Sequence, residues 1–178
     1  MSAPSGGIRH AGIDRLFHWV TAAAVLILLC TAFLPIAGLH FSWVGIHWIT
    51  GIVLIVAVAF HLLRSLFWQS LRSMWIGSGD FRSGAPSGKY SLAQKLMHHV
   101  LGLAVLTAVV TGALMLAKVD TPWWHRNPYW LSAGTWGVVY VLHGLAALAA
   151  VTLVMIHIYF SLLPEKRAFL RAMLRGHE

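Results

Sequence analysis

Residues 136–163 read WGVVYVLHGLAALAAVTLVMIHIYFSLL, an apolar stretch without Asp, Glu, Lys or Arg. It is long enough to cross a hydrocarbon core of about 30 Å, which takes about 20 residues of α-helix. His143 and His157 are separated by about 3.9 helical turns, or roughly 21 Å along the axis, so both rings point from nearly the same helix face. Ionisable residues inside a membrane span are costly and indicate a functional site. We therefore expect each imidazole to bind a partner, one near either face of a membrane.

The whole composition is that of a membrane protein. The 178 residues are 58% hydrophobic and 10% charged, with a mean hydropathy of +0.74, whereas a soluble domain carries about 25% charged residues. Three further apolar runs, at about 16–39, 43–68 and 95–116, are long enough to span a bilayer. The sequence predicts an all-α fold, an integral membrane four-helix bundle that forms one domain over residues 1–178.

The positive charge is distributed asymmetrically. The net charge is +8, and of thirteen basic residues only Lys118 and Arg126 flank the side between the third and fourth spans. The other eleven lie on the opposite side: Arg9, Arg15, Arg64, Arg72, Arg82, Lys89, Lys95, Lys166, Arg167, Arg171 and Arg175. Because loops rich in Lys and Arg stay in the cytoplasm, both termini are predicted to be cytoplasmic, in a bacterial inner membrane. This topology accounts for the charge without a nucleic-acid partner.

The cysteine count restricts the redox chemistry. Cys30 is the only cysteine, which excludes a cysteine-bound iron–sulfur cluster and a c-type haem attached through Cys-x-x-Cys-His. A redox metal would have to be held by histidine.

The depths of the histidines predict how they pair. His18 opens the first span on the cytoplasmic side, and His47 opens the second span on the periplasmic side. His47 is thus level with His143, and His18 with His157. Two such bis-histidine sites, one in each leaflet, favour two b-type haems with the histidines as axial ligands of the iron. Small residues on the stripe between His143 and His157 leave room for macrocycles.

His61 allows a second assignment. It follows His47 by the same spacing that separates His143 from His157, so His61 could face His157 in place of His18. The sequence permits both ligand sets. Otherwise His61 is a polar residue near the cytoplasmic boundary, beside Arg64.

Several motifs, taken in order, resemble a known family. They are DRLFHW (14–19), IHWITGI (46–52), KYSLAQK (89–95), LHG (142–144) and IHIY (156–159). The chain resembles the cytochrome b (gamma) subunit of respiratory formate dehydrogenase, within a group that includes the cytochrome b subunits of nickel–iron hydrogenases and thiosulfate reductases. The resemblance covers residues from about Arg9 to the C-terminus. It implies that His47 and His143 hold the periplasmic haem and that His18, not His61, joins His157 at the cytoplasmic haem.

The resemblance also implies a quinone site and protein partners. In the family, a stretch of the type Lys-Tyr-Asn-x-x-Gln-Lys contacts a quinone, menaquinone or ubiquinone, beside the cytoplasmic haem. Gln94 and Lys95 match that stretch, whereas Ser91 stands where asparagine is expected. His98, one turn after Gln94, is a candidate hydrogen-bond donor or proton relay. The implied partners are a periplasmic iron–sulfur subunit and a catalytic subunit, whose electrons pass through the two haems to quinone; the chain itself would not act on the primary substrate.

Three other functions fit the same sequence. The first is a quinol-oxidising cytochrome b that feeds a periplasmic reductase such as thiosulfate reductase, with the electron flow reversed. The second is a free-standing membrane electron carrier. The third is a metal-ion transporter without haem that uses the histidines as ligands.

Overall fold

The computed structural model describes residues 11–68, 74–81 and 90–176, except for the side chain of Phe169. Four helices are long and apolar enough to span a membrane. They are α1 (Gly12–Phe33), α2 (Trp43–Phe67), α3 (Leu92–Met115, extended by the 3₁₀ turn Leu116–Lys118) and α4 (Ala133–Leu162). The short 3₁₀ turns Ser78–Phe81 and Pro164–Lys166 precede α3 and the terminal helix α5 (Arg167–Arg175). The predicted all-α membrane fold is confirmed, with four long helices.

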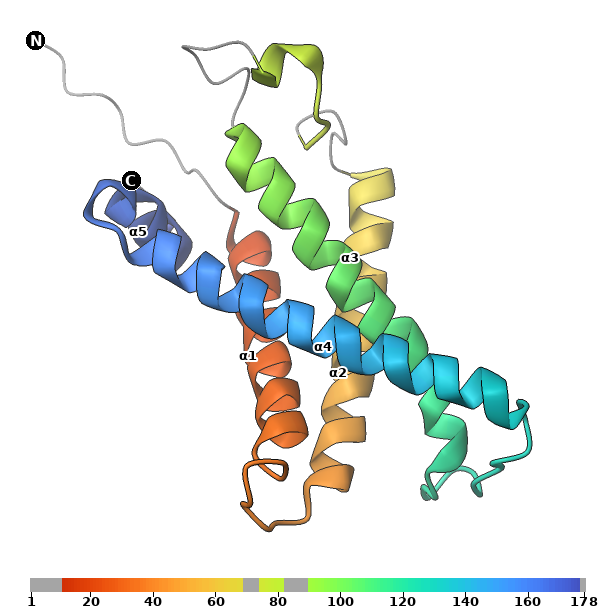
Figure 1. Ribbon diagram of the computed structural model, residues 1–178. Coiled ribbons are helices and arrows are strands. Elements are labelled where there is room, and N and C mark those ends of the chain that lie inside the picture. Colours follow the sequence, from red (N-terminus) through yellow and green to blue (C-terminus); the bar gives the residue numbers. More distant parts are fainter. Residues whose placement is uncertain (1–10, 69–73, 82–89, 177–178) are drawn as a thin grey trace, which may run out of the picture.

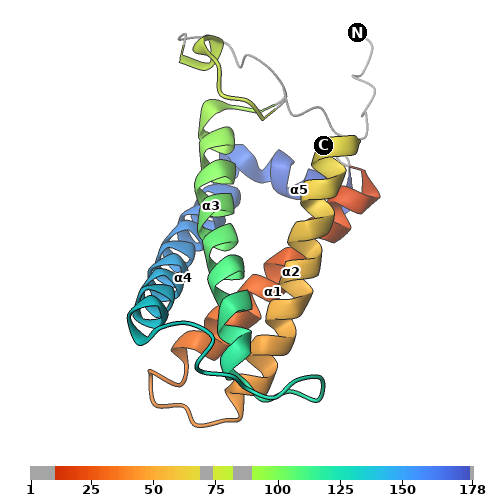
Figure 2. The same ribbon diagram turned by 90° about the vertical axis from the view of Figure 1, so that its right-hand side faces the viewer.

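The four long helices are arranged as two antiparallel pairs. The contacts between α1 and α2 and those between α3 and α4 are far more extensive than the contacts of α2 with α3. Figures 1 and 2 show α1 beside α2 and α3 beside α4. Described basic residues gather where α1 and α3 begin and α2 and α4 end, which we call the basic end: Arg15, Arg64, Lys95, Lys166, Arg167, Arg171 and Arg175. Arg9, Arg72, Arg82 and Lys89, predicted to lie on the same side, fall outside the described residues.

The helix boundaries follow from local capping chemistry. Ser91 and Gln94 form a reciprocal capping box that begins α3, and the Ser132 hydroxyl accepts a hydrogen bond from Thr135 N–H at the start of α4. Such caps satisfy N–H groups that have no partner within the helix. The first span was predicted at 16–39, but α1 runs from Gly12 to Phe33 and gives way to turns around Pro35. The apolar run extends past the helix end, so hydropathy alone placed that boundary too far along the chain.

The helices pack closely through small side chains and expose large ones. Buried apolar residues of the long helices include Ala24, Ala57, Ala104, Ala146 and Ala150, whereas many Leu, Ile, Val, Phe and Trp side chains are exposed. Small residues between helices and apolar residues outside are typical of helices in lipid, where burying apolar surface provides no driving force. The surface is therefore that of a membrane protein.

The terminal helix α5 closes the basic end against α1. Figure 2 shows α5 running across this end of the bundle from α4 towards α1. The side chains of Arg15 and Trp19 on α1 donate hydrogen bonds to the carbonyls of Leu174 (3.3 Å) and Met173 (3.2 Å). Ala172 is fully buried. These bonds satisfy carbonyls at the C-terminal end of α5, which have no partner within the helix.

A buried ion pair fixes the segment before α3. The Lys95 ammonium donates to both carboxylate oxygens of Asp80 (2.8 and 3.0 Å) and to the carbonyl of Trp75 (3.0 Å). The side chains of Lys95 and Asp80 are only 5% and 3% exposed. A second ion pair, between Arg64 and Asp14, joins α2 to α1.

Candidate functional site: two histidine pairs between the helix pairs

Two pairs of histidines connect the α1/α2 pair to α4. The rings of His18 on α1 and His157 on α4 have centroids 6.3 Å apart, and those of His47 on α2 and His143 on α4 are also 6.3 Å apart. The ring planes are inclined by 47° in the first pair and 71° in the second. The histidines that belong to each pair are those predicted from depth matching. Helix α4 carries one member of each pair, so the two sites lie at different depths.

This separation fits two imidazoles that share one metal atom. A metal–imidazole bond is about 2 Å long, and a ring centroid lies roughly 1 Å behind its ligating nitrogen. Two imidazoles on opposite sides of one metal therefore have centroids about 6 Å apart, as in both pairs here. The donor set fits the bis-histidine ligation of a b-type haem.

The number of protein ligands distinguishes haem from a bare metal ion. Among the described residues, no group of three or more His, Cys, Asp or Glu side chains could hold a metal ion. Bare zinc or another transition metal ordinarily takes three or four protein ligands. In the described part of the chain a histidine pair supplies two, which is sufficient when a porphyrin supplies the other four.

His61 has a different environment. Its ring stacks on Phe17 of α1, with centroids 4.7 Å apart, and meets His98 of α3 edge-on at 6.0 Å. The ring centroids of His98 and His99 are 5.6 Å apart. Nδ1 of His99 lies 2.7 Å from the carbonyl oxygen of Lys95. The structure thus places His61 in a separate histidine cluster near the basic end, while the ring facing His157 is that of His18.

The residues predicted for quinone contact have structural partners. Ser91 and Gln94 bind each other in the capping box (2.9 and 3.3 Å), and Lys95 is bound to Asp80. Ser91, Gln94 and His98 are nevertheless exposed, whereas Lys95 is buried. Serine is an effective N-cap, so its presence at position 91 has a structural role in starting α3.

Three residues beside the His47/His143 pair were not predicted from the sequence. The hydroxyl oxygens of Thr31 and Thr111 lie 2.8 and 2.9 Å from the Nδ1 atoms of His47 and His143. A Cβ added at Gly112 would lie 3.2 Å from Cε1 of His143. Polar residues within a span are a signal in the sequence, but only the helix arrangement shows which ring each one meets.

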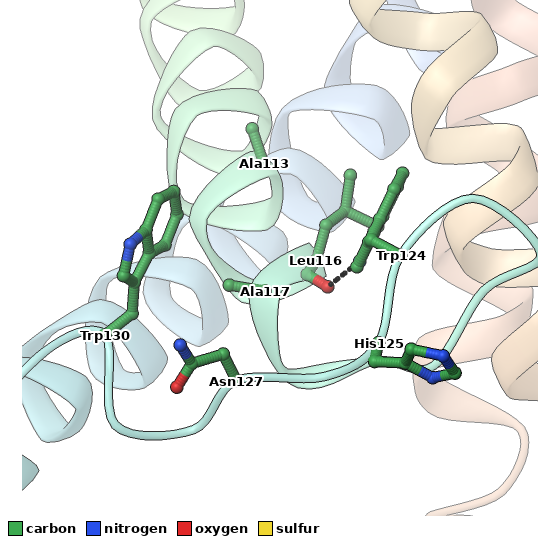
Figure 3. A pocket seen from close by; sticks show the side chains of 7 residues that line it. All are labelled: Ala113, Leu116, Ala117, Trp124, His125, Asn127 and Trp130. Atoms are coloured by element: carbon green, nitrogen blue, oxygen red, sulfur yellow. Dashed lines mark hydrogen bonds between the residues drawn. The ribbon is translucent and has the colours of Figure 1, made fainter.

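The loop between α3 and α4 folds back on α3 at the end opposite the basic end. Trp124 donates its indole N–H to the carbonyl of Leu116 (3.1 Å), and Asn127 N–H donates to the carbonyl of Ala117 (2.7 Å). Figure 3 shows the hollow that results, of about 380 Å³, between the end of α3 and the side chains of Trp124, His125 and Trp130. Trp123 packs edge-on against Trp48 of α2, at 5.8 Å. The loop therefore presents several aromatic side chains at this end of the bundle.

These features define a class of protein: a helical membrane protein with two histidine pairs between its long helices. The sequence matches the family described as prokaryotic cytochrome b561 over residues 9–176, and the chain belongs to this family. It is also 27% identical to the formate dehydrogenase, cytochrome b556 subunit, of Haemophilus influenzae, a match that covers 86% of this chain and 70% of the relative. The family implies b-type haem and electron transfer in a prokaryotic membrane.

Gly112→Ala is expected to disturb the His143 ring. The new methyl group would be closer to Cε1 than ordinary van der Waals contact allows, so the ring must move by a few tenths of an ångström. We expect an altered absorption spectrum or reduction potential of one haem in the purified protein. Gly102→Ala on the same helix is the matched control, because a Cβ there meets no atom within 4 Å. Equal spectral effects of the two substitutions would contradict the close contact.

Proposed function

We propose that the chain is the membrane-anchor cytochrome b subunit of a respiratory complex and holds two b-type haems. One observation carries the proposal: the ring centroids of His18 and His157, and those of His47 and His143, are separated by the same distance of 6.3 Å. These four histidines are the proposed axial ligands. Bound haems would supply one-electron chemistry, and ligation by two histidines each would leave no iron position open to oxygen or substrate.

The distribution of charged residues indicates which end of the bundle faces the cytoplasm. The concentration of basic residues at one end supports a cytoplasmic location for that end and both termini. The His18/His157 pair then lies towards the cytoplasm and the His47/His143 pair towards the periplasm. The aromatic loop between α3 and α4 is exposed on the periplasmic side, where an iron–sulfur subunit and a catalytic subunit would dock.

We place quinone exchange at the cytoplasmic end, near Ser91, Gln94 and His98. The exposed Gln94 and His98 side chains lie at the start of α3, and His98 belongs to the cluster with His61 and His99. A neutral imidazole has one N–H donor and one acceptor nitrogen, so this cluster is suited to pass cytoplasmic protons to a reduced quinone. Beside this cluster, the ion pair of Asp80 with Lys95 attaches segment 74–81 to α3.

The relative suggests the identity of the partner. That relative is named as a subunit of formate dehydrogenase, and we propose that this chain serves a formate dehydrogenase-like enzyme that donates electrons to the quinone pool. Reverse flow, from quinol to a periplasmic reductase, uses the same fold and the same ligands.

Anaerobic membranes from cells that produce the intact complex test this proposal. Formate is expected to reduce the b-type absorption bands, and added menaquinone or ubiquinone analogue to reoxidise them, while a tagged chain copurifies with iron–sulfur and molybdenum subunits. If formate leaves the bands oxidised, while quinol reduces them and thiosulfate reoxidises them, the chain belongs instead to a reductase complex. A tagged chain that purifies alone, with full haem content, would favour a free-standing carrier.

A further inference from the structure

The two rings of the His47/His143 pair have matching hydroxyl partners on neighbouring helices. Thr31 of α1 contacts Nδ1 of His47 on α2, and Thr111 of α3 contacts Nδ1 of His143 on α4, at 2.8 and 2.9 Å. The threonines are 3% and 5% exposed. Each threonine thus lies on the helix that is the antiparallel partner of the one carrying its histidine. The two contacts join α1 to α2 and α3 to α4 at this depth.

The direction of these hydrogen bonds follows from a count of protons. Each threonine oxygen also lies within hydrogen-bond distance of backbone carbonyls of its own helix: Ile27 (2.8 Å) and Leu28 (3.0 Å) for Thr31, Thr107 (2.6 Å) and Ala108 (3.2 Å) for Thr111. A carbonyl only accepts, and a hydroxyl has one proton. The hydroxyl proton therefore goes to the helix carbonyl, and the threonine oxygen accepts the Nδ1–H of the histidine.

This direction determines the tautomer of both rings. A neutral imidazole with its proton on Nδ1 has the lone pair on Nε2. The nitrogen available to a metal is then Nε2 in His47 and in His143. Because a threonine held by its own backbone has little freedom to rotate, the hydrogen bond also restrains the orientation of each ring.

The hydrogen bond has an electronic consequence as well. A ligating histidine whose other N–H is accepted by an oxygen becomes a more basic ligand. A more basic ligand stabilises the more highly charged ferric state relative to the ferrous state. Two such ligands on one iron act in the same direction and lower its reduction potential.

We propose that Thr31 and Thr111 are positioning residues that fix the Nδ1–H tautomer of His47 and His143 and lower the reduction potential of the metal centre that this pair holds. The proposal rests on the proposed function, since it takes these histidines as axial ligands of one haem. Gly112 supports the same arrangement, because the absence of a Cβ lets His143 approach α3 beside Thr111.

Redox titration of the purified holoprotein, followed by absorption, tests the proposal with Thr31→Val and Thr111→Val. Valine keeps the shape and removes the acceptor. The shift in potential reports the difference in strength of the hydrogen bond between the ferric and ferrous states, and a neutral hydrogen bond, worth about 1 kcal/mol net, limits the change in the preference for ferric iron to about fivefold. At about 59 mV per tenfold for a one-electron couple, each substitution is expected to raise one midpoint potential by up to about 40 mV. The double variant should show a larger shift of the same potential.

Matched controls separate the hydroxyl from packing. Thr31→Ser and Thr111→Ser keep the acceptor and should retain the original potential. Thr152→Val removes a hydroxyl whose partner among the described residues is the Leu148 carbonyl of its own helix, and it should leave both potentials unchanged. Where a valine variant loses its haem, the serine variant at the same position decides. Haem retained at the original potential in the serine variant supports the proposal, whereas loss of haem or a shifted potential there overturns it.

Unchanged potentials in valine variants that retain both haems would also overturn the proposal. That outcome would leave the proposed function intact, because the unsubstituted protein would still contain two b-type haems. Absence of a b-type spectrum from the unsubstituted protein would instead overturn the proposed function and, with it, the role assigned to the threonines.

Discussion

His18→Ala is expected to reduce the haem content of the purified protein by about half, whereas His61→Ala retains the full content. The reason is that the His18 ring faces His157 at 6.3 Å, and a bis-histidine haem loses one of its two protein bonds when either ring is removed. His61 instead stacks on Phe17 and meets His98. Haem per chain, measured by the pyridine haemochrome spectrum against protein concentration, provides the comparison.

The two variants are matched controls for each other, since both remove an imidazole near the basic end of the bundle. Loss of haem from His61→Ala, together with full content in His18→Ala, would reverse the ligand assignment at His157. A His18→Gln variant tests whether the fold survives, because glutamine restores a polar side chain. Its circular dichroism spectrum should show the helix content of the unsubstituted protein.

Lys95→Met is expected to destabilise the protein by about 3–5 kcal/mol, because it leaves the Asp80 carboxylate buried without its ammonium partner. Both side chains are almost fully buried, and the ammonium also binds the Trp75 carbonyl. Thermal unfolding in detergent, followed by circular dichroism, measures the change. Segment 74–81 should also become more accessible to protease, since the Asp80–Lys95 ion pair attaches it to α3.

An exposed ion pair is the appropriate control. Arg126 and Asp120 form a pair whose side chains are 69% and 61% exposed, and such pairs contribute about 0–1 kcal/mol. Arg126→Met should therefore change the unfolding temperature little. The double variant Lys95→Met/Asp80→Leu should recover much of the lost stability, because it removes the unpaired charge. A Lys95→Met protein as stable as Arg126→Met would show that the Asp80–Lys95 ion pair does not stabilise the fold.

The sequence was sufficient to predict four membrane helices and the pairing of His47 with His143. Hydropathy identifies spans because each must bury its backbone in lipid as helix. Depth along the spans then limits which histidines lie at the same level. The same reasoning left His18 and His61 as alternatives, because both lie near the basic end and depth says nothing about rotation around a helix axis.

The remaining features depend on packing between helices. Thr31 and Thr111 are ordinary threonines near the ends of apolar spans in the sequence, and they become histidine partners through the way α1 meets α2 and α3 meets α4. The docking of α5 on Arg15 and Trp19 likewise joins residues more than 150 positions apart. Such contacts have no local periodicity, so sequence patterns cannot predict them.

The central claim, that the chain holds two b-type haems through histidine pairs on α4, is tested most directly by the haem content of the purified protein. The account predicts a reduced-minus-oxidised spectrum with a b-type α band and two non-covalently bound haems per chain. It also predicts that His143→Ala and His157→Ala each lose a different haem, distinguishable by midpoint potential. A purified, folded chain without an α band, or one haem lost identically from both variants, would contradict it.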